Sequence, residues 1–308
     1  MIREDFFYDS RDGKSQIHAV RWIPEDRNPV AVLQIVHGMC EHVDRYEGFA
    51  EYLVSKGILV TAEDHLGHGK TVNDGIKGYI CRMDPATVMV RDVHRLKKIT
   101  GELFPNRPYY IFGHSMGSYI LRNYLFQYGK GIDGAIVAGT GMNSKISIAV
   151  LKVLASFGSA VLGKAQKPDK LLKKIVFGSY LKKIDKPRTD FDWLSKDEEV
   201  VEKYVEDPMC GFDFTGNGYR ALADLIWKSL KKSNVEKMPV TLRVLITSGA
   251  EDPVGDYGAG PKKLYKQFLD EGMQKIDFKI YDGNRHEILN ETNHEKVYED
   301  IYEWIVKA

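Results

Sequence analysis

Three residues with chemically useful side chains each follow a strand-like apolar run. Ser115 is the centre of a G-x-S-x-G pattern at residues 113–117, with an apolar run before it and a helical pattern after it. A sharp strand-to-helix turn exposes a serine hydroxyl at the helix N-terminus, and the small flanking glycines avoid clashes there. The pattern alone also fits a glycine-rich turn without chemistry, so the prediction of a nucleophile depends on its partners.

A serine becomes a good nucleophile only when an imidazole takes its proton and an acid orients that imidazole. Asp252 and His286 each lie just beyond the carboxyl end of a later apolar run, where ligands collect in open α/β sheets. Asp252 is the preferred acid because a proline closes its loop, and Glu251 and Asp256 are weaker candidates nearby. Ser115, Asp252 and His286 are therefore predicted to form a catalytic triad.

Attack on a carbonyl builds negative charge on oxygen, which preorganised N–H donors must stabilise. One donor is expected from Met116, the residue after the nucleophile, and the second from Met39 in the loop after the third strand. Both are backbone groups, so the two methionine side chains matter little for this predicted oxyanion hole.

Alternating strand and helix patterns must position these residues. Such alternation predicts an α/β fold with a mostly parallel sheet between helices. The apolar runs are 31–36, 58–62, 109–112, 134–138, 242–247 and 276–281, and the helical patterns are 45–56, 85–103, 116–128, 261–271 and 294–306. An Asp-Gly turn between two further runs, 6–10 and 16–23, predicts an antiparallel hairpin and brings the expected sheet to eight strands.

The alternation stops between residues 142 and 218, which predicts a mainly helical cap, or lid, inserted between core segments 1–141 and 219–308. Residues 145–188 hold eleven Lys or Arg and two Asp, whereas residues 189–213 hold nine Asp or Glu and two Lys. A basic amphipathic cap predicts peripheral contact with a membrane or lipid aggregate. A solvated surface with unevenly distributed charge explains the same pattern equally well.

Composition narrows the classes of function. The 308 residues include 44 Lys and Arg against 43 Asp and Glu, and a net charge of +1 argues against a dedicated nucleic-acid binder. Cys40, Cys81 and Cys210 are scattered and form no C-x-x-C pair, which argues against a disulfide scaffold or a structural zinc site. We therefore expect no metal and no cofactor, and nothing in the sequence predicts the oligomeric state.

No apolar run is long enough to predict a transmembrane helix, since the best candidate, 146–162, is short and contains Lys152. The N-terminus carries acids where a secretory signal needs an apolar run. These features predict a cytoplasmic location, with membrane contact limited to the surface.

Four motifs in this order resemble the monoacylglycerol lipase and bacterial lysophospholipase group of α/β-hydrolases. The resemblance covers the two core segments and is weak across the insertion. The motifs are His37-Gly38-Met39-Cys40-Glu41-His42 with Arg45-Tyr46, Asp64-His65-Leu66-Gly67-His68-Gly69-Lys70-Thr71, Gly113-His114-Ser115-Met116-Gly117 and Arg285-His286-Glu287-Ile288-Leu289-Asn290-Glu291.

This resemblance implies cofactor-free hydrolysis of carboxylic esters of glycerol or glycerophospholipids. It implies an acyl channel under the cap and places Glu41, Arg45 and His114 where the family lines or supports the alcohol side of the substrate. A purely structural role is the alternative for each of them, and we favour it for Arg45. Cys40 stands where the monoacylglycerol lipases often have Gly or Ala, which puts access to the oxyanion hole in question.

Other functions fit the same predicted triad. One is a general carboxylesterase for short-chain esters. Another is an iminopeptidase-like hydrolase, which needs a pocket carboxylate that the acidic stretch 190–213 is able to supply. A non-catalytic hydrolase-like binding protein is disfavoured because serine, acid and histidine are all present.

Overall fold

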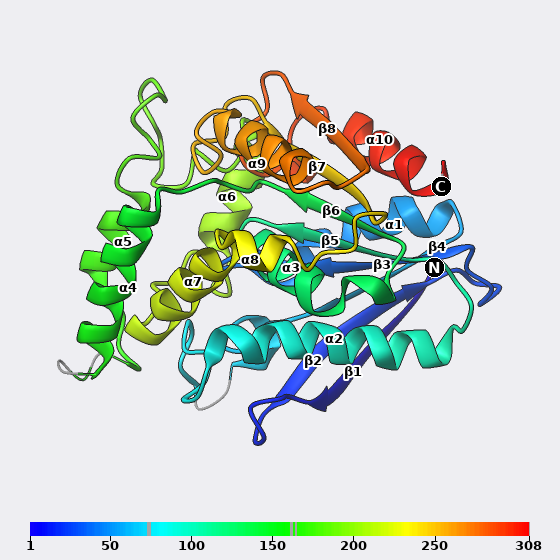
Figure 1. The fold of residues 1–308 in the computed structure, drawn as a ribbon, viewed down its shortest axis with the longest axis horizontal. Helices are drawn as coiled ribbons and strands as arrows, with labels where there is room; N and C mark the ends of the chain where they lie inside the picture. Colours follow the sequence, from blue (N-terminus) through cyan, green and yellow to red (C-terminus); the bar gives the residue numbers. More distant parts are fainter. Residues whose placement is uncertain (73–74, 161–162, 164, 308) are drawn as a thin grey trace.

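An eight-stranded sheet forms the centre of the molecule (Figure 1). The computed structural model describes residues 1–72, 75–160, 163 and 165–307. The strand order is β1-β2-β4-β3-β5-β6-β7-β8. The strands are β1 (Ile2–Asp9), β2 (Gln16–Ile23), β3 (Ala31–Val36), β4 (Ile58–Glu63), β5 (Tyr109–His114), β6 (Gly134–Ala138), β7 (Arg243–Gly249) and β8 (Lys275–Tyr281).

The strands from β3 to β8 are paired in parallel, whereas β2 runs antiparallel to both β1 and β4. The predicted α/β fold with a mostly parallel sheet and an antiparallel hairpin at its start is confirmed. β1 begins at Ile2, four residues before the expected start, because its whole length pairs with β2.

Helices cover both faces of the sheet (Figure 1). They are α1 (Glu47–Ser55), α2 (Pro85–Leu103), α3 (Met116–Tyr128), α8 (Lys232–Val235), α9 (Ala259–Asp270) and α10 (His294–Val306). The apolar sides of α1 and α10 share one core with Phe112 of β5, and those of α2, α3 and α9 share the other with Ile111. Adjacent residues of one strand thus point into opposite cores, which is why the central strands read as continuous apolar runs. The expected helix 45–56 is split into a short 3-10 helix, Val43–Tyr46, and α1.

The segment expected to form the cap contains α4 (Lys145–Ala160), α5 (Lys170–Phe177) and α6 (Glu198–Glu206). A further helix, α7 (Gly216–Ser229), crosses the expected boundary at residue 218 and packs against both α3 and α4. The apolar run 146–162 ends outside the described residues. Among the described residues, no helix is both long and apolar enough to cross a membrane.

Candidate active site

Ser115 occupies a strained turn between β5 and α3. Its φ of 53° and ψ of −119° lie in a region that side chains rarely adopt. The turn also brings the α3 backbone against β3, so that a Cβ on Gly117 would lie 2.0 Å from the carbonyl oxygen of Val36. Glycine is therefore required at position 117, because β3 and the start of α3 approach each other closely. This close approach holds Ser115 at the end of β5.

His286 and Asp252 lie beyond the ends of β8 and β7, and their side chains contact each other. His286 Nδ1 lies 3.0 Å from Asp252 Oδ1, and both side chains are buried. Asp252 also accepts hydrogen bonds from Ser248 Oγ at 2.9 Å and from the N–H of Val254 at 2.9 Å. Burial alone would raise the pKa of Asp252, but the neighbouring His286 and these hydrogen bonds lower it below its usual value.

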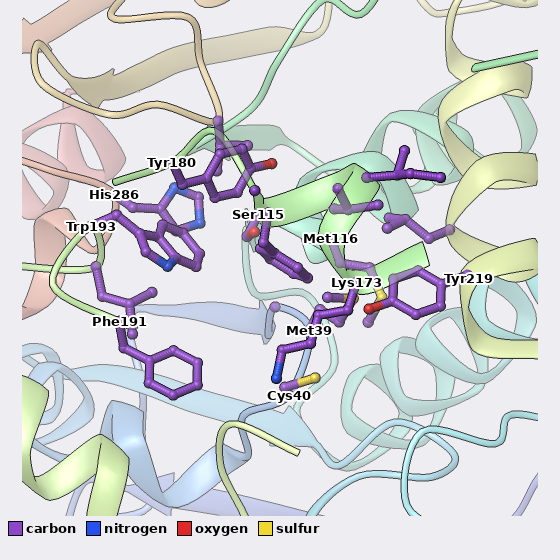
Figure 2. Close-up of a pocket in the computed structure, with 18 of the residues that line it drawn as sticks. Met39, Cys40, Ser115, Met116, Lys173, Tyr180, Phe191, Trp193, Tyr219 and His286 are labelled. Atoms are coloured by element: carbon purple, nitrogen blue, oxygen red, sulfur yellow. The ribbon is translucent and has the colours of Figure 1, made fainter. Parts of the chain in front are cut away.

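An ionised Asp252 accepts a hydrogen bond from Nδ1–H, so the neutral His286 ring keeps its lone pair on Nε2. That nitrogen is buried and has no hydrogen-bond partner among the residues described. Figure 2 shows Ser115 and His286 beside the same cavity, which both residues line. Glu251 instead pairs with Lys196 at the surface, so Asp252 is the acid that meets the histidine.

The loop after β3, residues 37–42, contains Met39 and is called the oxyanion loop below; the carboxylate of Glu41 holds its conformation. Glu41 Oε1 accepts the N–H of Gly38 at 2.5 Å and the hydroxyl of Tyr46 at 3.0 Å. This arrangement ties residues 38–41 into a turn, with Met39 beside Ser115 in the cavity wall (Figure 2). Met116 lines the same part of the wall. The two residues expected to supply oxyanion donors thus line the same cavity as Ser115.

Four ionisable groups, three of them buried and Arg45 partly exposed, form a cluster behind this loop. Arg45 donates to both oxygens of Glu287, at 2.6 and 2.7 Å, and to Glu41 Oε2 at 3.0 Å. His114 Nδ1 lies 3.3 Å from Glu41 Oε1, and its Nε2 lies 3.2 Å from the carbonyl oxygen of His286. Two carboxylates and one guanidinium leave one negative charge, and both ring nitrogens of His114 face oxygen atoms, so this environment favours the doubly protonated ring. Burial lowers the pKa of His114, but Glu41, Glu287 and the carbonyl of His286 together raise it above its usual value.

These positions separate the three residues that the resemblance placed near the alcohol. Glu41 and His114 line the cavity, whereas Arg45 lies behind them, with its guanidinium 4.8 Å from the ring centre of Tyr204. Glu287, which the sequence analysis did not single out, also lines the cavity. Its position directly after His286 was the one available signal.

The cavity has a volume of about 470 Å³ and lies between the core and residues of the predicted cap. Trp193 packs on His286 with 5.1 Å between ring centres, and Tyr180 packs on Trp193. The N–H of Glu287 also donates to the carbonyl of Leu194 at 2.7 Å. The rest of the wall is mostly apolar and includes Ile148, Leu151, Phe177, Phe191, Phe212, Tyr219, Leu222 and Ile226. Sequence reasoning missed these aromatic residues because the segment has no strong periodicity.

Cys40 lines the cavity and is hydrogen-bonded to three residues of the predicted cap that also line it. Its thiol donates to the carbonyl of Phe212 at 3.0 Å, and its own carbonyl accepts from Tyr204 Oη at 2.9 Å and from the N–H of Gly211 at 3.0 Å. The residue thus bonds the oxyanion loop to the segment that follows α6. Its φ of 58° adds a second strained position next to Met39.

The histidine-rich turn 64–69 has a structural role. Asp64 accepts the N–H groups of Val43 and Lys70, and a Cβ on Gly69 would lie 2.3 Å from its carboxylate. Burial lowers the pKa of His65 to about 4, so its ring is neutral. These contacts join the turn to the loop after β3.

A family model described as "Serine aminopeptidase, S33" (Hydrolase_4) matches residues 27–293. The chain belongs to this family of α/β-hydrolases. It is a serine hydrolase, as the family and its lipase relatives indicate. The contact between His286 and Asp252, and the cavity that His286 shares with Ser115, are consistent with membership of this family.

Several relatives resemble this hydrolase over nearly its full length. A monoacylglycerol lipase of Mycolicibacterium smegmatis is 28% identical over 92% of this chain and 91% of its own, and a rat monoglyceride lipase is 26% identical over 92% and 84%. A thermostable carboxyl esterase from Bacillus coagulans, solved in complex with glycerol, is 32% identical with a TM-score of 0.92, covering 100% of this chain and 99% of its own. These similarities support ester hydrolase activity.

Proposed function

We propose that this hydrolase cleaves a lipid monoester, either a monoacylglycerol or a lysophospholipid, through an acyl-enzyme on Ser115. The observation that carries the proposal is the apolar cavity of about 470 Å³ that contains Ser115 and His286. Its size fits a small-molecule site, and its aromatic and aliphatic wall suits an acyl chain. Lipase relatives of similar length support this substrate class.

In the first half of the reaction, His286 Nε2 takes the proton of Ser115 Oγ, and the oxygen attacks the ester carbonyl. The backbone N–H groups of Met39 and Met116 stabilise the resulting oxyanion. His286 then gives its proton to the departing alcohol, while Asp252 stabilises the imidazolium and keeps the proton on Nδ1.

In the second half, the same histidine activates water, which releases the fatty acid and restores Ser115. The Trp193 ring against His286 shields the imidazole from bulk solvent. Shielding strengthens the charge interactions between His286 and Asp252.

The charges of the cavity favour a neutral ester over a peptide with a free ammonium group. Glu41 and Glu287 line the cavity, but they are already paired with Arg45 and His114. Asp190 is the other carboxylate among the described lining residues, and it is exposed at the rim. Asp190 is therefore the residue on which an iminopeptidase-like activity would depend.

A matched substrate panel tests the proposal, with Ser115→Ala as the inactive control. The panel contains monoacylglycerol, lysophosphatidylcholine, triacylglycerol, short p-nitrophenyl esters and an aminoacyl anilide. We expect the highest kcat/KM on a monoester lipid. Activity confined to short soluble esters would make the chain a general carboxylesterase, and cleavage of the anilide that Asp190→Asn abolishes would favour the peptidase.

We further propose that α4 and α5 touch the membrane surface that holds the substrate. α4 exposes an apolar stripe at helical spacing, made of Ile146, Val150, Val153, Leu154 and Phe157. Leu171 and Ile175 of the adjoining α5 are exposed too, and Lys170 and Lys174 stand beside them. Exposed apolar side chains next to lysines favour the interface of an anionic bilayer.

The double variant Ile146→Ser/Phe157→Ser tests this contact. Hydrolysis of monoacylglycerol in anionic vesicles should fall, whereas hydrolysis of a soluble short ester should not change. Leu269→Ser, which removes a leucine from α9 whose exposed fraction is 45%, is the control. Equal losses on both substrates would contradict membrane contact.

A further inference from the structure

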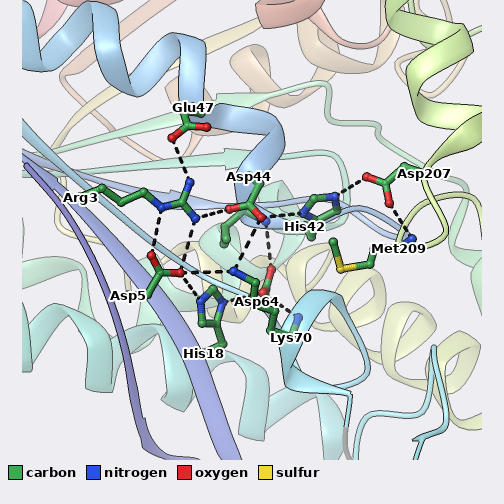
Figure 3. Close-up of polar contacts among 11 residues, drawn as sticks. Arg3, Asp5, His18, His42, Asp44, Glu47, Asp64, Lys70, Asp207 and Met209 are labelled. Atoms are coloured by element: carbon green, nitrogen blue, oxygen red, sulfur yellow. Dashed lines mark hydrogen bonds and ion pairs between the residues drawn. The ribbon is translucent and has the colours of Figure 1, made fainter. Parts of the chain in front are cut away.

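His42, Asp207 and Cys210 form a cluster outside the cavity, where the oxyanion loop meets the segment after α6. Their nearest ligand atoms, one from each side chain, all lie within 4.8 Å of one another. His42 Nε2 is 2.7 Å from Asp207 Oδ2 (Figure 3). The imidazole and the thiol are buried, while 26% of the Asp207 side chain remains exposed.

We propose that these three side chains bind a divalent metal ion, best matched by Zn²⁺, that links the oxyanion loop to the predicted cap. One imidazole nitrogen, one carboxylate oxygen and one thiolate sulfur are the donor types that Zn²⁺ prefers, and water completes a tetrahedral site. This inference is independent of the substrate proposed above.

The spacing of the ligand atoms suits a tetrahedral ion after small side-chain rotations. Bond lengths of about 2.0–2.3 Å to zinc place neighbouring ligand atoms roughly 3.3–3.8 Å apart. The 2.7 Å contact between His42 and Asp207 must widen by about 0.6 Å, and the longest separation of up to 4.8 Å must shorten by about 1 Å. Rotation of the partly exposed Asp207 side chain accommodates both changes and opens a path from solvent.

The surroundings already orient two of the three ligands. His42 Nδ1 faces Asp44 Oδ2 at 3.8 Å, and Asp207 Oδ1 accepts the N–H of Met209 at 2.7 Å (Figure 3). A carboxylate behind the free nitrogen of a ligating histidine is a recurrent feature of zinc sites, because it fixes the tautomer and the direction of the ring.

The site would also join parts that are far apart in the chain. His42 follows Glu41, which holds the Gly38 turn, and Cys210 precedes Gly211, whose N–H donates to Cys40. An ion shared by His42 and Cys210 would therefore reinforce the existing bonds around the oxyanion loop. On binding, the thiol proton of Cys210 leaves to solvent, and the thiolate coordinates the ion.

Titration of untagged, reduced, chelator-treated protein with Co²⁺ tests the proposal. A cysteine ligand gives a thiolate-to-cobalt charge-transfer band, and tetrahedral coordination gives intense visible bands that Zn²⁺ should abolish by displacement. Cys210→Ser and Asp207→Asn should each weaken Zn²⁺ binding about 100-fold or more, because even outer partners of a metal site contribute about 10–100-fold. Cys81→Ser, which changes a buried cysteine outside the cluster, should bind as the unmodified chain does.

Two measurements keep the result decisive if a variant folds poorly. Zn²⁺ should raise the Tm of the unmodified protein and of Cys81→Ser, but not that of Cys210→Ser. X-ray absorption of the zinc-loaded unmodified protein should show one sulfur at about 2.3 Å together with N or O ligands at about 2.0 Å. No charge-transfer band, or a zinc shell without sulfur, would overturn the proposal.

Discussion

Replacing Asp252 by asparagine tests the proposed roles of acid and histidine separately. Asp252 Oδ1 accepts hydrogen bonds from His286 Nδ1 and from the N–H of Val254, whereas Oδ2 accepts one from the hydroxyl of Ser248. A backbone N–H always donates, so Val254 should hold the oxygen of the new side-chain amide at the Oδ1 position. The hydroxyl of Ser248 is able to accept from the amide nitrogen instead. The variant should therefore keep the proton on His286 Nδ1 and lose only the charge.

The size of the effect follows from that lost charge. Two unit charges about 4 Å apart, at an effective dielectric constant of about 20, interact by about 4 kcal/mol. This energy stabilises the imidazolium only in the transition state, so its loss should lower kcat/KM about 10³-fold. A triad whose histidine adopts the wrong tautomer loses about 10⁴-fold instead.

The assay combines kinetics on a soluble p-nitrophenyl ester with ¹⁵N NMR of the histidine tautomer. Ser248→Ala is the control, since it removes one hydrogen bond and leaves the charge, and it should cost less than about tenfold, near the net value of one such bond. A His286 ring protonated on Nε2 in Asp252→Asn would refute the argument from Val254. A loss below about tenfold would refute the proposed role of the carboxylate charge.

Three further variants test how the fold supports the site. Burial raises the pKa of Glu63 to about 8, so the folded chain keeps a proton that the unfolded chain releases near 4.5. The free energy of unfolding should therefore fall as pH rises between these values. Urea titrations should show a flatter pH dependence of stability for Glu63→Gln, and an unchanged slope would contradict this. Gly117→Ala should abolish labelling of Ser115 by a fluorophosphonate, because its Cβ would meet a β3 carbonyl at 2.0 Å, whereas Gly101→Ala on α2 has space and should label normally. Arg45→Leu should lower the free energy of unfolding by about 3–5 kcal/mol, since it leaves two buried carboxylates without their cation. Chemical denaturation measures this change. A loss below about 1 kcal/mol would show that the ion pairs are not needed for stability.

Local sequence patterns predicted most of the core. The helices 85–103, 116–128 and 294–306 match α2, α3 and α10 residue for residue, because each has a strong apolar period and a clear start or stop. Ser115, Asp252 and His286 were predicted from their places after strand-like runs. Parallel strands bring such ends to one edge of a sheet, so position along the chain already implied proximity in space.

The limits of this reasoning appear where contacts depend on long-range packing. The helical patterns of segment 142–218 do not indicate how it packs on the core, so Trp193 and Tyr180 were not recognised as neighbours of His286. The boundary expected at residue 218 falls inside α7, because that helix packs on core and insertion alike. Glu287 and Arg45, 242 residues apart in sequence, form a buried pair that no local pattern indicates.

The sequence by itself thus determined the order of the elements, the α/β class and the residues suited to acyl transfer. Periodicity, turn chemistry and strand ends are local properties, and each is visible in a short window of residues. Only the tertiary structure decided the shape and lining of the cavity, the charge balance around His114, and the meeting of His42 with Asp207 and Cys210. These features arise where distant segments pack together, and burial there decides which charges are paired and which side chains face the site.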